Sequence, residues 1–358
     1  MDQSAEGGKE VVLVTGVNGY VGSWVAFKLL EADEYCVAGT VRDPSNQEKL
    51  GVIKEGLGEE KFSKISFYSA DMNQPDSIKK AVQESQCSYI IHVASPFPSS
   101  QPKDENELIE PAVTGTTTIM EAAFDNGVKR VVITSSCAAI ESFTRDTETT
   151  TNEESWHDIE NSPTNAYYKS KLFAEKVAWE FYNNLTEEQK KSFGLCVLNP
   201  GFIIGPLLLK SGGTSQDLIT EMFDGRLAKM AHMYSSCIDI RDVADAHIRA
   251  LTCEPGNRFP LAEGTYCFAE VAEVLQEKYN KEGFNIKFSN PPKTLLWLMS
   301  FVSNDADYYY KRWGAKCIID SSKTKEMLNI DFISMKTSIL EMAESLLAFG
   351  FIKKPEIK

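Results

Sequence analysis

Short apolar runs alternate with segments of helical spacing along the first 206 residues of the chain. The runs are short and apolar enough for strands that are buried on both faces of a sheet, and they lie at 11–14, 35–41, 65–70, 89–93, 131–133 and 195–198. Between them, helical patterns occupy 24–30, 111–126 and 167–183. Strands that alternate with helices in this way predict an α/β fold built on a doubly wound parallel sheet.

Beyond residue 206 this regularity weakens, although helical patterns continue at 218–231, 268–279 and 334–349. We therefore expect most of 207–358 to form a smaller second lobe. Segments near 237–240 and 264–268 are candidates for strands that return to the main sheet. Residues 1–9 are polar and acidic, which is typical of a flexible tail.

Three glycines follow the first apolar run and open the first helical segment: Gly16, Gly19 and Gly22. In a strand–turn–helix unit, the first glycine allows a tight turn, the second lets the backbone approach a pyrophosphate, and the third lets the helix pack on the strand. The N-terminus of the helix then offers unpaired N–H groups to the phosphates. The pattern predicts that residues 10–206 form a Rossmann-type domain that binds a dinucleotide.

Charge and cysteine content restrict the other classes of partner. The 358-residue chain has a formal net charge of −14, which disfavours binding to nucleic acid or to an anionic membrane surface. Its apolar runs are far shorter than the ~20 residues of a membrane-spanning helix. The eight cysteines are scattered without a CxxC pair, so no metal site is predicted. Free thiols suggest a reducing, cytoplasmic location.

The end of the second apolar run bears on the choice of cofactor. Arg42 stands where a Rossmann unit meets the adenosine ribose, and a guanidinium there suits the 2′-phosphate of NADP. Lys49 adds a second cation seven residues later. Asp43, which would accept a hydrogen bond from a free 2′-hydroxyl, keeps NAD as the alternative. An ordinary solvated arginine is the structural alternative for Arg42.

Two further strand ends carry candidate contacts. Asp71 follows the third run, where its carboxylate could accept a bond from the adenine amino group or cap the helix that starts near Pro75. The small residues Ala94 and Ser95 follow the fourth run and leave room for the cofactor's ribose and diphosphate. His92, inside that run, is expected to be a core histidine.

Tyr167 and Lys171 carry the predicted chemistry. They are four residues apart on one helical face, where the ammonium would lower the pKa of the phenol and bond the nicotinamide ribose. Ser136, at the end of the fifth run, would hold a substrate oxygen beside Tyr167, with Ser135 as its nearest rival. A carbonyl held there would receive hydride from the nicotinamide and a proton from Tyr167. Residues 207–358 would then supply most substrate contacts.

The motifs TGVNGYVG, TVRDP, HVASP, VVITSSCAA, NAYYKSK and NPGFIIGP occur in the order found in extended short-chain dehydrogenase/reductases. The chain resembles their dihydroflavonol reductase-like branch, and NEESW and DIRDVADAH resemble its fungal aldehyde reductases. This resemblance implies an NADPH-dependent carbonyl reductase with Ser136, Tyr167 and Lys171 as catalytic residues. It implies cofactor contacts at Gly16, Asn18, Gly19, Tyr20, Val21, Gly22, Arg42, Lys49, Asp71, Met72, Val93, Ala94, Ser95, Tyr167, Lys171, Pro200, Gly201, Phe202 and Ile203.

The chain departs from this branch at one position and leaves other activities open. Glu141 stands where dihydroflavonol reductases usually carry Asn or Asp, five residues after the catalytic serine. The NWYCYGK-type sequence of cinnamoyl-CoA reductases is also absent. The alternatives are a sugar-nucleotide epimerase or dehydratase that retains NAD, a 3β-hydroxysteroid-type dehydrogenase and a non-enzymatic NADP sensor. We expect a small carbonyl compound as substrate, and a monomer or homodimer.

Overall fold

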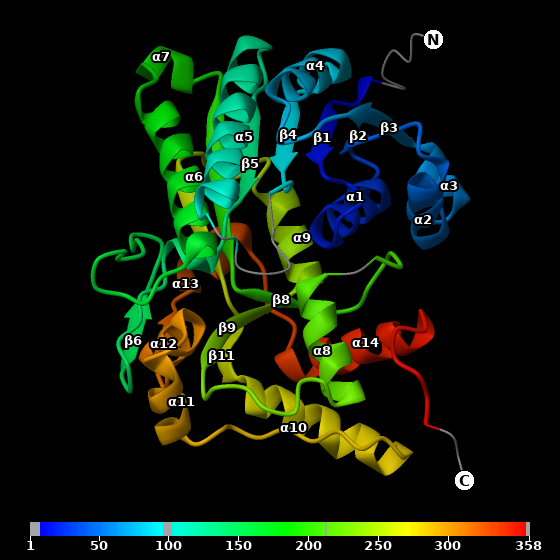
Figure 1. Ribbon diagram of the computed structural model, residues 1–358. Coiled ribbons are helices and arrows are strands. Elements are labelled where there is room, and N and C mark those ends of the chain that lie inside the picture. Colours follow the sequence, from blue (N-terminus) through cyan, green and yellow to red (C-terminus); the bar gives the residue numbers. More distant parts are fainter. Residues whose placement is uncertain (1–7, 96–101, 103, 212, 356–358) are drawn as a thin grey trace.

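The computed structural model describes residues 8–95, 102, 104–211 and 213–355, so most of the predicted tail and Pro96 of the HVASP motif lie outside the described residues. Its main sheet has seven parallel strands, which confirms the predicted fold class (Figure 1). In spatial order they are β10 (Asn257–Leu261), β7 (Gly194–Pro200), β5 (Arg130–Thr134), β4 (Tyr89–His92), β1 (Val11–Thr15), β2 (Cys36–Val41) and β3 (Ile65–Ser69). The strand order reverses between β1 and β4, where a doubly wound sheet opens a crevice.

The central strands are mostly apolar because helices cover both faces of the sheet. Val12 and Val14 of β1 belong to the core on the face of α1, α2 and α9, whereas Leu13 belongs to the core under α4, α5 and α6. These helices are α1 (Tyr20–Ala32), α2 (Gln47–Leu57), α9 (Ile240–Arg249), α4 (Pro75–Ser85), α5 (Asn106–Asp125) and α6 (Ala166–Asn183). Alternate side chains thus enter opposite cores, as expected for an internal parallel strand.

The expectation for strands beyond residue 206 needs a correction. The segments near 237–240 and 264–268 do not join the main sheet; they belong to a separate three-stranded sheet of β11 (Gly264–Cys267), β9 (Tyr234–Asp239) and β8 (Phe202–Ile204). The segment that returns is β10, which the apolar pattern did not reveal because it contains Arg258 and Pro260. An edge strand tolerates proline, since one side of it needs no ladder hydrogen bonds.

The remaining elements form a two-stranded sheet, a second core and several short helices. The segment 141–163 contains β6 (Glu148–Thr151), which pairs with β12 (Lys316–Ile319) of the C-terminal part. The second core lies between β8, β9 and three helices: α8 (Thr214–Asp224), α10 (Phe268–Tyr279) and α14 (Met335–Ala348). The other helices are α3 (Glu59–Ser63), α7 (Glu187–Lys190), α11 (Lys293–Ser300), α12 (Asn304–Lys311) and α13 (Ser322–Leu328), with short 3-10 turns at η2 (Cys137–Ala139) and η3 (Asn280–Glu282).

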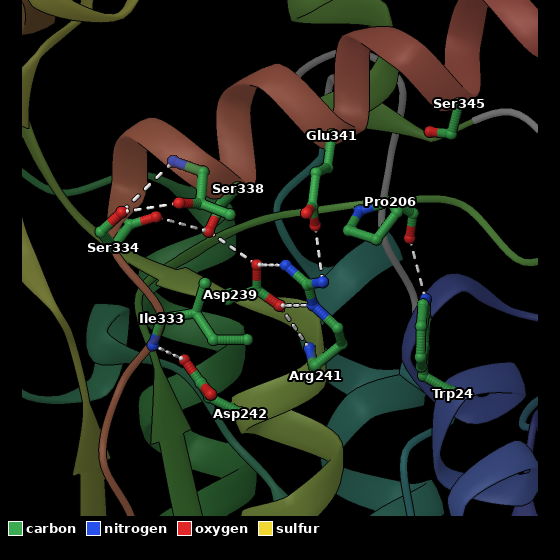
Figure 2. A network of polar contacts seen from close by, with 12 residues as sticks. Trp24, Pro206, Asp239, Arg241, Asp242, Ile333, Ser334, Ser338, Glu341 and Ser345 are labelled. Carbon is green, nitrogen blue, oxygen red and sulfur yellow. Dashed lines mark hydrogen bonds and ion pairs between the residues drawn. The ribbon is translucent and has the colours of Figure 1, made fainter.

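A buried carboxylate joins the two cores. Asp239, at the end of β9, accepts hydrogen bonds from the backbone and guanidinium of Arg241 at 2.7–2.9 Å and from Ser338 Oγ of α14 at 2.6 Å (Figure 2). Arg241 also pairs with Glu341 of α14 at 2.5 Å. Close by, Trp24 of α1 donates to the carbonyl of Pro206 at 2.9 Å. The bonds of Asp239 and Arg241 fix the C-terminal helix α14 against the part of the chain that contains the main sheet.

No helix within the described parts of the chain combines the length and apolar character that crossing a membrane requires.

Candidate active site

One large cavity, of about 1450 Å³, lies at the carboxyl ends of the strands and extends to the second core. Its walls come from the β1–α1 turn, the ends of β2 to β5 and β7, the start of α6, and the helices α8 and α12. Ligands of open α/β sheets bind at this edge, at the point where the strand order reverses. The cavity is therefore the place where the predicted site residues should meet.

The glycine turn has the geometry that its sequence predicts. Gly16 has a φ of +68°, a conformation that favours glycine over residues with a Cβ. A Cβ on Gly22 would lie 2.3 Å from the carbonyl oxygen of Gly16, so the helix can approach the strand only without a side chain here. Gly19 is the N-cap of α1 and provides no side-chain cap, which leaves N–H groups at this end for an anion. The same cavity wall includes Asn18, Tyr20 and Val21.

The two basic residues expected near the cofactor ribose, Arg42 and Lys49, differ in position. Arg42 follows the last residue of β2 and lines the cavity. The Asp43 carboxylate bonds Ser45 N at 2.9 Å and Ser45 Oγ at 2.6 Å, contacts that lower its pKa. Lys49 lies in the first turn of α2 and is exposed, and it is not among the residues that line the cavity. Arg42 therefore lies on the cavity wall, whereas the carboxylate of Asp43 is hydrogen-bonded to Ser45.

The neighbouring strand ends also reach the cavity. Asp71 and Met72 line it, and the Asp71 carboxylate accepts a bond from Asn73 N at 2.9 Å instead of capping α4, whose N-cap is Gln74. Val93, Ala94 and Ser95 line it as well. His92 is buried against Thr15 Oγ1 at 2.9 Å, and burial lowers its pKa to about 3, so it is a neutral core residue at physiological pH.

The end of β7 and the start of β8 complete the wall with Pro200, Gly201, Phe202 and Ile203. A Cβ on Gly201 would lie 2.4 Å from the carbonyl oxygen of Ser236, so glycine lets this segment pack directly on β9. The backbone N–H of Gly201 donates to Leu261 O of β10 at 2.9 Å. The edge strand β10 thereby helps to hold the segment.

The three predicted catalytic side chains lie together on this cavity. Tyr167 Oη donates to Ser136 Oγ at 3.4 Å, and Lys171 Nζ lies 5.9 Å from the centre of the Tyr167 ring. Lys171 Nζ also donates to Ser95 Oγ at 3.0 Å, on the side of the cavity that holds the residues predicted to contact the cofactor. Asn165 begins α6 by accepting a bond from Tyr168 N, which fixes the first turn that carries Tyr167.

Ser135, the rival of Ser136, has another partner. Its hydroxyl donates to Glu175 at 2.5 Å, whereas the hydroxyl of Ser136 is the one that contacts Tyr167. The Ser136 oxygen also accepts a bond from Ala138 N at 3.1 Å, which fixes its position at the start of η2. Of the two serines, Ser136 is therefore the one placed to hold an oxygen beside the phenol.

The direction expected for the pKa of Tyr167 is wrong. Burial raises the pKa of Tyr167 to about 12, because the phenolate loses its hydration, and the contact with Ser136 offsets only part of this. Burial lowers the pKa of Lys171 to about 8, with Glu175 acting in the opposite direction. At neutral pH the phenol is thus protonated beside a mainly charged ammonium, which is the state that a proton donor requires.

The comparisons with known proteins agree with this geometry. The family model described as "NAD dependent epimerase/dehydratase family" matches residues 12–261. The chain belongs to this family. Its relatives in the epimerase/dehydratase family include the NADPH-dependent methylglyoxal reductase of Saccharomyces cerevisiae, 30% identical over 94% of this chain and 98% of that protein. Cinnamoyl-CoA reductase 1 of Petunia hybrida is 30% identical over 98% of this chain and 96% of that protein.

A solved structure supports the same assignment. The yeast methylglyoxal/isovaleraldehyde reductase, crystallised with NADPH, superposes with a TM-score of 0.77 at 30% sequence identity and covers 95% of this chain and 99% of that chain. The predicted family and its reductase branch are confirmed, and the yeast relatives named here are NADPH-dependent or bind NADPH in their crystals. The epimerase/dehydratase family name by itself covers more than one reaction, so the site must decide between them.

Sequence reasoning missed Glu175, a buried carboxylate of α6 that does not line the large cavity but bonds residues next to it. Glu175 accepts bonds from Ser135 Oγ at 2.5 Å and from Asn199 Nδ2 at 2.6 Å, and it pairs with Arg258 Nε at 2.6 Å. It therefore connects the ends of β5 and β7 with α6 and β10. A helical position four residues after Lys171 was a signal in the sequence, but its partners are distant in sequence.

Arg312, just after α12, was also missed and has no sequence signal. Its guanidinium lies 3.7 Å from the centre of the Phe143 ring and donates to Tyr168 Oη at 3.2 Å. Tyr168 Oη in turn lies 3.4 Å from Glu141 Oε2, to which it donates. Burial raises the pKa of Glu141, and the Arg312 charge opposes this. Glu141, Tyr168 and Arg312 all line the cavity, so this polar set forms part of its wall.

Proposed function

We propose that this chain is an NADPH-dependent reductase of small aldehydes and ketones. The observation that carries the proposal is the contact between Tyr167 and Ser136 beside Lys171, on the wall of the cavity that also holds the glycine turn and Arg42. NADPH, when bound, supplies the hydride. The protein's own groups have to bind the cofactor, hold the carbonyl oxygen and deliver a proton.

The residues present fit this cofactor. The side-chain-free turn at Gly16 and Gly19 and the uncapped start of α1 suit a pyrophosphate. Arg42 suits a 2′-phosphate, since guanidinium pairs with phosphate in a bidentate manner. Lys171 and Ser95 lie where a ribose would be held, and the segment 200–203 would cover the nicotinamide end.

In the proposed reaction Ser136 Oγ donates a hydrogen bond to the carbonyl oxygen, and Tyr167 Oη donates the proton to that oxygen as it gains charge. The raised pKa of Tyr167 keeps the phenol protonated until the carbonyl is reduced. The Lys171 ammonium then stabilises the phenolate that remains. Reprotonation from solvent would restore the site.

The sugar-nucleotide epimerase reading has weaker support. Such an enzyme retains NAD, and the acid that would accept a bond from a free 2′-hydroxyl, Asp43, is bonded to Ser45. The choice of substrate within the reductase class rests on the polar wall of Glu141, Tyr168 and Arg312. A carbonyl compound with a second polar group fits this wall better than a purely aliphatic one.

The test is NADPH consumption, followed by absorbance, with a panel of methylglyoxal, isovaleraldehyde, an aromatic ketone, cinnamoyl-CoA and a sugar nucleotide. We expect carbonyl-dependent NADPH loss with at least one aldehyde or ketone, and protein that leaves gel filtration without bound NAD. Sugar-nucleotide conversion by protein that retains NAD, without turnover of any free carbonyl, would contradict the proposal.

We also propose that the protein acts in the cytoplasm as a monomer or homodimer. Support comes from cysteines that are all free among the described residues, as expected in a reducing compartment. Cell fractionation and light scattering of the purified chain test these two points. Enrichment with a membrane fraction, or a larger assembly, would contradict them.

A further inference from the structure

Two cysteines from distant parts of the chain place their sulfurs in contact. Cys196 lies within β7 and is fully buried, whereas Cys253 follows α9 and is partly exposed. Their Sγ atoms are 3.6 Å apart. A disulfide bond needs about 2.05 Å, a difference that side-chain rotation about Cα–Cβ can supply when the backbones are already adjacent. The two chain segments lie side by side here, since Gly256 N donates to Leu195 O at 2.7 Å and Cys196 Sγ contacts Glu254 O at 3.7 Å.

A partly buried cation lies against the pair. Nη1 of Arg130 is 3.6 Å from Cys196 Sγ and donates to the carbonyl oxygens of Ala250 at 3.1 Å and Cys253 at 2.7 Å. Within the described part of the chain, the acceptors of these three bonds are all neutral. Arg130 Nε is buried there without an acceptor. The positive charge of the guanidinium therefore remains available to stabilise a thiolate.

The two thiols differ in exposure, and this sets their roles: Cys253 is partly exposed, whereas Cys196 is fully buried. The contact with Cys196 and the Arg130 charge both lower the pKa of Cys253. The contact with Cys253 and burial raise the pKa of Cys196, and Arg130 opposes this. Cys253 is thus the sulfur that a peroxide can reach, and Cys196 is the buried thiol beside it.

We propose that Cys253 and Cys196 form a peroxide-sensitive dithiol site that closes reversibly to a disulfide. In the first step the Cys253 thiolate attacks one oxygen of a hydroperoxide, the O–O bond breaks, and a sulfenic acid and an alkoxide or hydroxide result. In the second step Cys196 sulfur attacks the sulfenic sulfur, its proton joins the departing hydroxyl, and water leaves. The two sulfurs lose two electrons and the peroxide gains them.

The other described cysteines lack this combination. Burial raises the pKa of Cys87, Cys137, Cys237, Cys267 and Cys317, which keeps these thiols neutral. Cys36 is partly exposed, as Cys253 is, and provides a matched control. Neither Cys196 nor Cys253 lines the active-site cavity, so the site is separate from the proposed reductase chemistry.

Peptide mapping of the full chain tests the proposal. Fully reduced protein is treated with hydrogen peroxide near one equivalent, free thiols are alkylated, and the cysteine peptides are identified by mass spectrometry. We expect a peptide pair linked through Cys196 and Cys253, lighter by two hydrogen atoms than the reduced pair, and its loss after a thiol reductant is added. Cys36→Ser should leave this link unchanged.

Two variants separate the steps. Cys253→Ser should abolish the link and leave Cys196 open to alkylation after unfolding. Cys196→Ser should stop the reaction at a sulfenic acid on Cys253, which a dione reagent traps. Recovery of both cysteines as alkylated thiols while peroxide oxidises other cysteines would overturn the proposal, as would a link from Cys253 to any other cysteine. The wild-type map decides this even where a variant fails to fold.

Discussion

Oε2 of Glu175 lies 2.5 Å from Oγ of Ser135, the residue before the proposed catalytic serine. The same oxygen accepts a bond from Asn199 at 2.6 Å, one residue before the segment that covers the cofactor side of the cavity. A single buried carboxylate therefore fixes the ends of β5 and β7 relative to the helix that carries Tyr167 and Lys171. Catalytic geometry in this chain depends on a residue that touches neither proposed substrate nor cofactor.

Glu175→Gln should change the pH dependence of turnover. Glu175 raises the pKa of Lys171 against the effect of burial, so its removal should move that pKa below about 8. The fall in turnover at alkaline pH should then begin at a lower pH than in the wild type, by on the order of one pH unit. The measurement is kcat against pH, with Glu180→Gln, an exposed change on the same helix, as control. An unshifted alkaline limb in folded Glu175→Gln protein would show that the carboxylate has a structural role only.

Stability should fall in the same variant. Glutamine leaves Arg258 buried without its ion-pair partner, and breaking such a pair costs about 3–5 kcal/mol. The free energy of unfolding in denaturant measures this loss. Glu175→Asp, which keeps the charge, should recover part of the pH profile even where it does not recover full stability. This separates the electrostatic effect on Lys171 from loss of packing.

Arg42→Asp should reverse cofactor preference. The change replaces attraction by repulsion at the 2′-phosphate, and a lost charged hydrogen bond of about 1.5–3 kcal/mol lowers kcat/KM for NADPH by about 10- to 100-fold. The value for NADH should fall much less. Lys49→Asp is the matched control, since Lys49 is exposed and does not line the cavity. Equal losses with both cofactors would remove Arg42 from the proposed phosphate site.

Asp242→Asn should stabilise the protein more at high pH than at low pH. Burial, together with the charges of Asp239 and Asp245, raises the pKa of Asp242 to about 7. The folded state thus binds this proton more tightly than the unfolded chain, whose aspartates titrate near 3.9, so this group's contribution to stability is lost as pH rises through about 7. The amide oxygen of the introduced asparagine can still accept the bond from Ile333 N, which Asp242 receives at 2.8 Å (Figure 2).

The measurement for this variant is the free energy of unfolding in denaturant at pH 5 and pH 8.5. We expect the gain at pH 8.5 to exceed the gain at pH 5 by about 1–3 kcal/mol, because the carboxyl of the folded protein loses its proton only near pH 7, whereas that of the unfolded chain is already ionised at pH 5. Asp331→Asn, which alters an exposed carboxylate elsewhere in the chain, is the control. A gain that is equal at both values, or larger at pH 5, would show that Asp242 is ionised throughout this range.

Six strands of the main sheet could be predicted because each is a local apolar run, buried on both faces by helices. The glycine turn and the pair of Tyr167 and Lys171 are also local patterns. By contrast, β10 joins the sheet through pairing with β7, and its Arg258 and Pro260 conceal it from any apolar count. The strands β8, β9 and β11 form their own sheet because of tertiary packing, which cannot be inferred from a short stretch of sequence.

Electrostatic features of the site were the least accessible to sequence reasoning. The partners of Glu175 and Arg312 come from elements far apart in the chain, so spacing could not join them. The pKa of Tyr167 was expected to fall because Lys171 is close in sequence. Burial outweighs that charge, and the degree to which an atom is buried depends on the whole fold.

The central claim is that Tyr167 donates the proton to a carbonyl held by Ser136. Tyr167→Phe tests it most directly, with turnover and NADPH affinity measured on the same preparation, and with Tyr182→Phe, a buried tyrosine of the same helix that does not line the cavity, as control. We predict a fall in kcat of about 10²- to 10⁴-fold with an almost unchanged Kd for NADPH, and a far smaller fall in kcat for the control. Near-normal turnover by Tyr167→Phe would contradict the account.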